Sequence, residues 1–166
     1  MSSIENLKEA FAGESQANRK YLAFAKKADA DGYPQIAKLF RAAAAAETVH
    51  AHTHLRVLGG VQETTENLKA AAEGEGFEFQ EMYPKFVAEA EAEDNKAALR
   101  SFNMAMAVEE IHHDLYTKAL SSAQSGSDLP ERAVYVCEIC GNTVYDDAPE
   151  TCPICRAPKA KFFLVD

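Results

Sequence analysis

Two motifs in the chain place a glutamate three residues before a histidine, Glu47-x-x-His50 and Glu109-x-x-His112. Residues three apart on an α-helix project from the same face, so each motif could present one carboxylate and one imidazole to the same ion. Carboxylates neutralise the charge of a metal ion, and imidazole is a suitable ligand for iron. One such pair in a helix rich in alanine and glutamate is weak evidence, but a repeated pair indicates a metal centre.

Three more glutamates interrupt otherwise apolar helical stripes, namely Glu14, Glu75 and Glu78. A buried carboxylate without a partner is costly, so five of them in one helical region predict two bound divalent or trivalent ions. Glu14 precedes Glu47 by 33 residues and Glu75 precedes Glu109 by 34, which indicates a helical hairpin that occurs twice. Glu-x-x-His on two helices with glutamate on the other two is the ligand pattern of di-iron carboxylate bundles.

All four cysteines lie in two C-x-x-C pairs that eleven residues separate, and they are Cys137, Cys140, Cys152 and Cys155. Two such pairs predict a tetrahedral four-sulfur site, and in a reducing compartment this clustering indicates metal binding rather than disulfides. The spacing does not choose between iron and zinc. Iron would make the site a one-electron carrier, whereas zinc would make it structural.

The helices that carry these ligands follow from apolar periodicity. We expect helices over about 3–30 and 34–58, a third from about 64 that bends at Pro84, and a fourth from about 94. Four amphipathic helices with short connections form a bundle. The stretch SAQSGSDLP has the composition of a linker. We therefore predict a mainly α protein with a four-helix bundle over 1–124, a linker over 125–130 and a small β-rich metal domain over 131–166.

The charge of the chain limits its partners. Lys and Arg number 17 against 26 Asp and Glu, which gives a formal net charge of −9. Nucleic acids and anionic membrane surfaces require a basic face, so neither is an expected partner. No apolar run approaches the roughly 18–20 residues of a membrane span, and the start of the chain lacks the features of a signal peptide. We expect a cytoplasmic protein.

The motifs occur in an order that resembles one known family. FAGESQA, ETVH, EGEGFEFQEMYP and EEIHHDLY are followed by the paired C-x-x-C motifs, with CPIC and APK. This combination resembles the rubrerythrins over nearly the whole chain. The resemblance implies a ferritin-like di-iron bundle joined to a rubredoxin-like Fe(Cys)4 domain. It also implies a cytoplasmic peroxidase that reduces hydrogen peroxide to water in oxidative stress defence, with electrons from an NAD(P)H-dependent reductase, often through a rubredoxin.

The resemblance further implies ligand roles at the matching positions. Glu47 and Glu109 would bridge the two irons of an oxo- and carboxylate-bridged pair. Glu14 would bind one iron, and Glu75 and His112 would bind the other. The four cysteines would bind a single iron, with zinc as the alternative metal.

Four other positions carry narrower expectations. Glu78 and His50 would exchange as ligands of the first iron, because a carboxylate suits ferric iron and a neutral imidazole suits ferrous iron. Tyr21 either packs in the core or donates a hydrogen bond to a ligand. The family usually has glycine directly after the last cysteine, and this chain has Arg156. If that position requires a positive φ, the arginine is strained.

A second Glu-x-x-His pair overlaps the first in EEIHHDLY. Glu110 and His113 have the same spacing, but their helix face carries polar residues. We expect Glu110 to be solvated. His113 is expected on the surface or behind the ligands.

The connection between the second and third helices constrains the assembly. In ferritin-like bundles these helices run parallel, so the connection must travel back along a helix of about 35–40 Å. The seven residues Gly59–Thr65 span at most roughly 25 Å. The bundle then has either an up-down-up-down order or a domain-swapped homodimer, and we favour the swap.

Three other functions are alternatives to the peroxidase. A ferroxidase or iron-storage protein uses the same bundle but does not need the cysteine module. A redox-sensing binding protein would recognise a partner in only one oxidation state. A zinc-ribbon protein that binds nucleic acid is disfavoured by the acidic charge.

Overall fold

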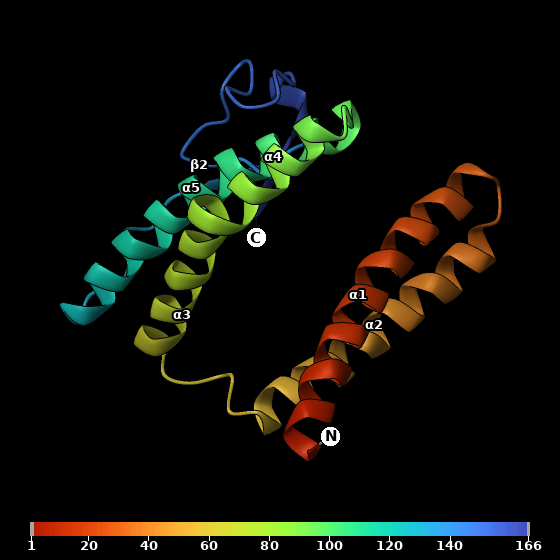
Figure 1. Ribbon diagram of the computed structural model, residues 1–166, viewed down its shortest axis with the longest axis horizontal. Coiled ribbons are helices and arrows are strands. Elements are labelled where there is room, and N and C mark those ends of the chain that lie inside the picture. Colours follow the sequence, from red (N-terminus) through yellow and green to blue (C-terminus); the bar gives the residue numbers. More distant parts are fainter. Residues whose placement is uncertain (1, 166) are drawn as a thin grey trace. The chain divides into compact units, whose positions relative to one another are not determined.

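A computed structural model describes residues 2–165 of the chain (Figure 1). The chain forms two compact units, Met1–Gln62 (unit 1) and Glu63–Asp166 (unit 2). Both units are largely helical, and unit 2 also contains a small antiparallel sheet near the end of the chain. The predicted fold class, mainly α with a small β-rich part, is confirmed.

Unit 1 is a helical hairpin of α1, Ser3–Ala30, and α2, Pro34–Val57, which agrees with the predicted helices to within one residue. A capping box between Ser2 and Glu5 begins α1. Pro34 lies in the first turn of α2, where its missing N–H leaves no bond unmade. The contact between the helices is made by small buried side chains, Ala25, Ala28, Ala37, Ala44 and Ala51.

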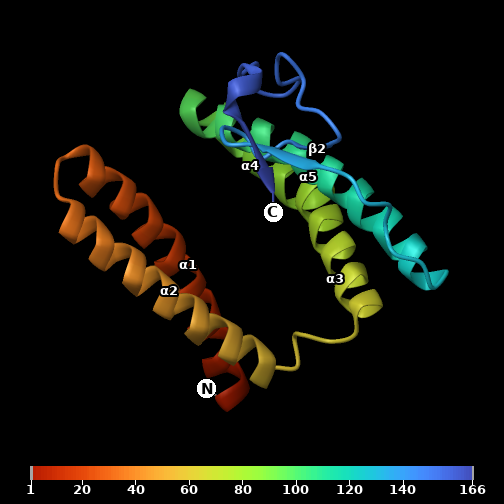
Figure 2. The same ribbon diagram turned by 180° about the vertical axis from the view of Figure 1, so that it is seen from behind.

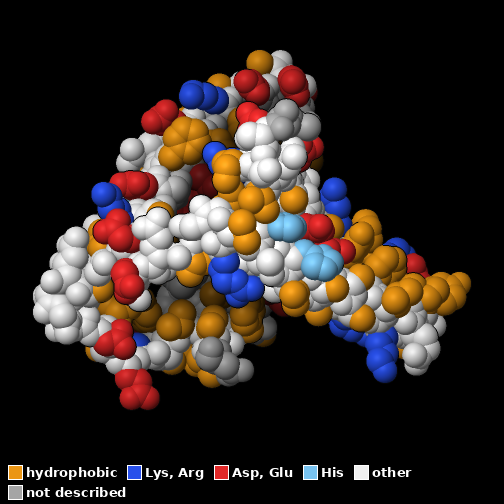
Figure 3. Space-filling view, turned by 90° about the horizontal axis from the view of Figure 1, so that it is seen from below, with side chains coloured by type: hydrophobic (Ala, Val, Ile, Leu, Met, Phe, Trp, Pro, Cys, Tyr) orange, Lys and Arg blue, Asp and Glu red, His pale blue; other side chains and the backbone are white. Residues whose placement is uncertain are grey.

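Large apolar side chains remain exposed on one face of α2. Ile36 is 48% exposed, Leu39 69% and Val57 63%. Each of the three is separated from His50 by close to a whole number of helical turns, so all three lie on the same face of α2 as this histidine. Figure 3 shows patches of hydrophobic side chains on the surface of the molecule. Within residues 2–165, no helix combines the length and apolar composition that crossing a bilayer requires.

Unit 2 begins with α3, Thr64–Phe77, a π-helical segment η1, Glu78–Met82, and α4, Tyr83–Ala92, which follow one another without a break. All three pack against α5, Lys96–Gln124. The chain changes direction between α3 and α4 (Figure 1), as predicted for Pro84. The π-helical turn was not predicted. It inserts one extra residue per turn at Glu78, and such turns occur often at functional sites.

The end of unit 2 is a three-stranded antiparallel sheet in the order β2-β1-β3. Strand β1 covers Val134–Cys137, β2 covers Thr143–Tyr145 and β3 covers Phe162–Val165. A 3-10 turn, η2, at Lys159–Lys161 precedes β3. Strand β2 lies beside α5 in both ribbon views (Figures 1 and 2). Helix α5 therefore supports both the helices and the sheet of unit 2.

Candidate metal centres

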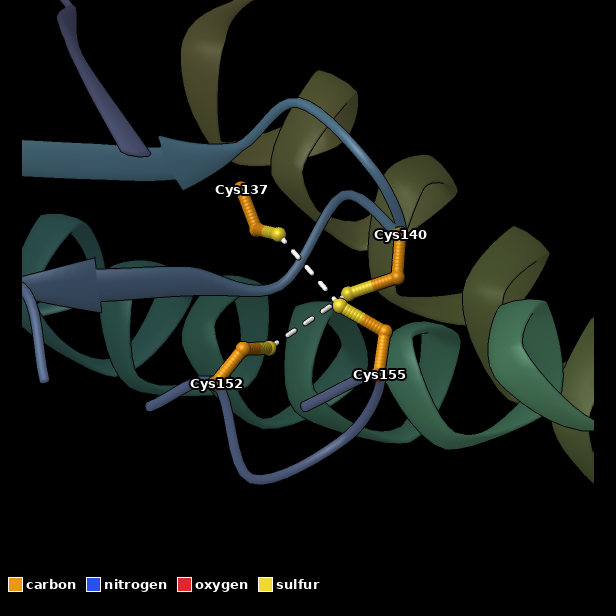
Figure 4. Close-up of side chains that lie close together, drawn as sticks. All are labelled: Cys137, Cys140, Cys152 and Cys155. Carbon is orange, nitrogen blue, oxygen red and sulfur yellow. Dashed lines mark hydrogen bonds between the residues drawn. The ribbon is translucent and has the colours of Figure 1, made fainter. Parts of the chain in front are cut away.

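Two matching loops direct the four cysteine side chains toward one point (Figure 4). The four sulfurs lie within 4.8 Å of one another and belong to Cys137, Cys140, Cys152 and Cys155. In each loop, the residue after the second cysteine donates its backbone N–H to the carbonyl of the first cysteine. Gly141 donates to Cys137 O at 2.8 Å, and Arg156 donates to Cys152 O at 3.0 Å.

The two loop-closing residues have positive φ, 86° at Gly141 and 66° at Arg156. The positive φ considered for Arg156 from the sequence is confirmed. Glycine adopts this conformation without a steric penalty, whereas a residue with a Cβ is disfavoured there by roughly 1–2 kcal/mol. The second loop therefore carries backbone strain that the first avoids.

The surroundings of the four thiols favour ionisation of all four only when a cation is bound among them. Burial opposes ionisation of Cys152, but backbone hydrogen bonds from Cys155 and Ile154 outweigh it and lower its pKa to about 7. Burial raises the pKa of both Cys140 and Cys155. Because a metal ligand must be a thiolate, a bound cation would supply the charge that keeps all four sulfurs ionised. None of the four is in a disulfide, so the donor set fits one iron.

Unit 1 gathers the first set of carboxylate and imidazole ligands. Glu14 from α1 and Glu47 and His50 from α2 have ligand atoms within 4.8 Å of one another. His50 Nδ1 lies 2.9 Å from Glu47 Oε2. The hydrogen bond with Glu47 raises the pKa of Glu14, and the hydrogen bond with His50 lowers the pKa of Glu47. The two carboxyl groups therefore interact directly, and a bound cation would relieve the repulsion between them.

Unit 2 gathers the second set. Glu75 from α3 joins Glu109 and His112 from α5, again within 4.8 Å, and His112 Nδ1 lies 2.8 Å from Glu109 Oε2. Burial and then the charge of Glu109 raise the pKa of Glu75 to about 7. Glu78 from η1 lies outside this close set, but burial and the charge of Glu109 raise its pKa too. A multivalent cation would relieve the repulsion among these carboxylates.

The structure thus brings six of the seven predicted ligands of the helical region into two groups, one in each unit. The seventh, Glu78, lies outside both groups but close enough to Glu109 for its charge to raise the pKa of Glu78. Each group offers two carboxylates and one imidazole, a donor set that suits iron. The assignment of each side chain to a particular iron stays a prediction.

Thr143, which the sequence analysis missed, holds the imidazole of His112. Thr143 Oγ1 in β2 lies 3.0 Å from His112 Nε2 and donates a hydrogen bond to Gly141 O at 3.1 Å. With a metal ion on Nδ1, the imidazole would carry its proton on Nε2 and donate it to Thr143 Oγ1. Such a hydrogen bond on the other ring nitrogen is usual for histidine ligands and fixes the orientation of the ring. Thr143 and His112 are 31 positions apart, so no local pattern indicated the contact.

The two tyrosines near the acidic groups have different surroundings. The ring of Tyr21 packs against Phe24 and Phe40, with centroid distances of 6.3 and 6.2 Å. Its hydrogen bond to a ligand stays a prediction. Burial and the charges of three nearby glutamates raise the pKa of Tyr83, which places this phenol beside the acids of unit 2. The motif EMYP contains Tyr83, but its spacing gave no sign of a role.

These features define a class of protein in which helical carboxylate and histidine groups are combined with a rubredoxin-like four-cysteine site. Residues 5–120 match the rubrerythrin family, and residues 135–163 match the rubredoxin-like domain of rubrerythrin. The chain therefore belongs to the rubrerythrin family.

Several relatives and solved structures are similar to nearly the whole chain. Rubrerythrin-2 of Clostridium acetobutylicum is 37% identical, and the alignment covers 94% of this chain and 92% of the relative. Nigerythrin of Nitratidesulfovibrio vulgaris is also 37% identical, with 97% of this chain and 85% of the relative covered. The structure of fully reduced, all-ferrous nigerythrin matches with a TM-score of 0.59 and 35% identity, over 99% of this chain and 87% of that one.

Proposed function

We propose that the protein is a non-haem di-iron peroxidase that reduces hydrogen peroxide to water with electrons relayed through a one-iron four-cysteine site. The observation that supports this proposal is the presence, in one chain, of two Glu-Glu-His sets and a four-sulfur site joined to one of them by hydrogen bonds. When bound, the paired irons would supply two electrons and Lewis acidity for cleavage of the O–O bond, and the four-cysteine iron would supply single electrons.

The side chains of the two sets prepare this chemistry. Glu47 and Glu109 offer carboxylates that neutralise the charge of the bound ions. Burial and the charge of Glu109 raise the pKa of Glu75 to about 7, so a bound ion would favour release of its proton. The phenol of Tyr83 lies beside the acids of unit 2, whose charges raise its pKa further, so it is a candidate donor of a hydrogen bond to peroxide.

The proposed route for electrons lies within unit 2. It leaves the sulfur site at Cys140, follows the backbone to Gly141, and crosses the 3.1 Å hydrogen bond to Thr143. It then crosses the 3.0 Å hydrogen bond to His112. His112 would hold a metal ion and would lie at the end of this hydrogen-bonded path. An NAD(P)H-dependent reductase, directly or through a rubredoxin, would donate to the cysteine site.

Each unit holds one of the two ligand sets, so a di-iron site needs one copy of unit 1 and one of unit 2. We propose that they come from different chains in a domain-swapped homodimer. The short connection Gly59–Thr65 supports the swap, because it cannot travel back along a helix. The exposed apolar face that carries His50 supports a helical partner for unit 1.

Mixing two defective chains tests the swap. In a heterodimer of Glu47→Ala and Glu109→Ala chains, one swapped bundle carries both substitutions and the other carries neither. About half of the bundles in that species should regain two irons, measured by metal analysis after subunit exchange. If exchange restores no intact site, each bundle is built from one chain.

Anaerobic stopped-flow absorption tests the peroxidase. Stoichiometric peroxide should oxidise the reduced di-iron site within seconds, and a site that stays reduced would rule the activity out. Metal analysis discriminates the ferroxidase alternative, because sustained loading beyond three irons per chain would favour iron storage.

A further inference from the structure

His113 makes contacts that neither metal centre uses, although it follows His112 directly. His113 Nδ1 lies 2.8 Å from Ala72 O in α3. A carbonyl oxygen can only accept a hydrogen bond, so Nδ1 carries the proton. The side chain is half-buried against α3. The two adjacent histidines of α5 therefore face different elements, because His112 reaches β2 and His113 reaches α3.

Gly76 and Phe79 complete the surroundings of this imidazole. A Cβ at Gly76 would lie 3.1 Å from His113 Nδ1 and 3.3 Å from its Cε1. The ring of Phe79 lies 5.4 Å from the imidazole, centroid to centroid. Ala72, Gly76 and Phe79 follow one another at intervals of four and three residues, so the imidazole rests along one stripe of α3 and η1. The absence of a side chain at Gly76 makes room for it.

The stripe lies directly beside the acids of unit 2. Glu75 precedes Gly76, and Glu78 precedes Phe79. The buried residues of α3 are Ala72 and Gly76. Such small side chains allow close approach but resist sliding or rotation of one helix on another only weakly. The hydrogen bond of His113 is a directional contact between α5 and α3, and it anchors α3 one turn before Glu75.

We propose that His113 is a positioning residue that fixes α3 on α5 and thereby places the carboxylate of Glu75 against Glu109 and His112. It acts through Glu75 and needs no contact with the metal. The proposal deepens the proposed metal-binding function of this ligand set and rests on it. The contact with Gly76, however, can be tested without any metal.

The first experiment is a double-mutant cycle on the metal-free protein. Gly76→Ala raises the intrinsic helix propensity of α3, so it should stabilise the protein unless the new methyl group collides with the imidazole. We expect Gly76→Ala to lower the urea midpoint in the parent and to raise it when His113→Ala has removed the ring. If Gly76→Ala raises the midpoint equally in both backgrounds, the imidazole does not occupy this space and the proposal is wrong.

The second experiment uses Co²⁺ as the probe. His113→Asn keeps a hydrogen-bond donor at the position of Nδ1, whereas His113→Leu keeps bulk without a donor. We expect the leucine variant to bind Co²⁺ at the carboxylate sites roughly tenfold or more weakly, in the range found for partners of metal ligands. The asparagine variant should recover most of this loss. The thiolate-to-cobalt absorption of the cysteine site is the internal control and should not change.

Two results would overturn the proposal. One is a leucine variant that binds Co²⁺ at the carboxylate sites as tightly as the parent does. The other is an asparagine variant that binds no better than the leucine variant, since packing alone would then explain the loss. A parent protein that binds Co²⁺ only at the cysteines would instead contradict the proposed function, and the metal-free cycle would still decide the position of His113.

Discussion

Units 1 and 2 fold the same Glu-x-x-His motif into a helix, but they surround it differently. The side chain of His50 in unit 1 is 55% exposed, whereas that of His112 in unit 2 is 26% exposed. The two glutamates are alike, with Glu47 18% exposed and Glu109 17%. Thr143 holds the far nitrogen of His112. Within residues 2–165, the side chain of His50 is hydrogen-bonded to Glu47 alone.

This difference shows what a ligand motif specifies and what it leaves to the fold. The i, i+3 spacing brings glutamate and histidine together in both units. Whether the imidazole is fixed depends on residues distant in the sequence, because the hydrogen bond of the other ring nitrogen orients the ring. The comparison supports a proposal in which His112 is a permanent ligand and His50 exchanges with Glu78.

The two units also differ in charge. Residues 1–62 contain eight Lys and Arg against six Asp and Glu, whereas residues 63–166 contain nine against twenty. Two of the six acids in unit 1 are the candidate ligands Glu14 and Glu47. Opposite net charges favour the association of a unit 1 with a unit 2 over the association of two like units. This is the pairing in the proposed domain-swapped homodimer.

The largest expected effect is loss of both irons from the bundle, and it should be the same for a substitution in either unit. Glu47 and Glu109 are equally buried, and both are proposed to bridge the two irons. Glu47→Ala or Glu109→Ala should each remove both irons of the bundle, since either change deletes a charge that two ions share. Metal analysis should find one iron per chain, at the cysteine site. Glu110→Ala is the matched control, because Glu110 is exposed on the same helix. Retention of two bundle irons in either test variant would contradict the ligand assignment.

Cys152→Ser tests the function that unit 2 alone provides. The variant should lose the ferric–thiolate absorption, because a hydroxyl is a poor replacement for a thiolate ligand. Its reduced di-iron site should still react with one equivalent of peroxide, since the bundle ligands are intact. Steady-state turnover with a reductase should collapse. Unchanged turnover would mean that electrons reach the bundle by another route.

Local sequence signals predicted the helices well. The bounds of α1, Ser3–Ala30, agree because capping at Ser2 and the GYP stretch after the helix act over a few residues. The cysteine loops were predictable for the same reason, since C-x-x-C encodes a turn and two ligands at once. The π-helical turn at Glu78 was not predicted, because it depends on how α3 and α4 pack on α5 as well as on Pro84.

The contacts that orient the ligands could not be predicted from the sequence. Thr143 and His112 are 31 positions apart, and His113 and Ala72 are 41 apart. Nothing in the local pattern of a threonine or of a second histidine indicates such a partner. The division of the ligand sets between two compact units also comes from tertiary packing, although the short connection Gly59–Thr65 indicated an unusual assembly.

His50→Ala should have a milder effect than loss of a bridging glutamate. The oxidised site should still assemble with two irons, because His50 is exposed and is proposed to bind mainly the ferrous state. Peroxidase turnover should fall, since the reduced site would lack a ligand. The matched substitution in unit 2, His112→Ala, should impair assembly itself. Full activity of the His50→Ala variant would rule out ligand exchange.

Thr143→Val removes the hydroxyl that orients His112 but nearly keeps the shape of the side chain. Loss of such a partner typically costs about 10–100-fold in activity, and we expect the lower end because Glu109 still contacts the ring. Reduction of the di-iron site by the reduced cysteine site, followed by stopped-flow absorption, should slow. Thr143→Ser keeps the hydroxyl and should retain the parent rate. Equal rates in the valine and serine variants would exclude Thr143 from the electron route.

The smallest expected effect is a gain in stability confined to the cysteine module. Arg156 has φ of 66°, where an L side chain is disfavoured by roughly 1–2 kcal/mol. Glycine there would relieve this strain but would raise the entropy of the unfolded chain, so we expect Arg156→Gly to stabilise the module by about 1 kcal/mol or less. Urea unfolding followed by the ferric–thiolate absorption would show a higher midpoint, whereas the helical signal of unit 1 should not shift.

Asp146 provides the control for this last substitution. Its φ is 65°, close to that of Arg156, but aspartate tolerates this region better, and its carboxylate pairs with Arg132. Asp146→Gly should therefore give no gain, because the relief of strain is smaller and the ion pair is lost. If both glycine variants stabilised the module equally, backbone strain at Arg156 would not distinguish the second cysteine loop from the rest of the module. An unchanged midpoint for Arg156→Gly would show that the loop accommodates the arginine without strain.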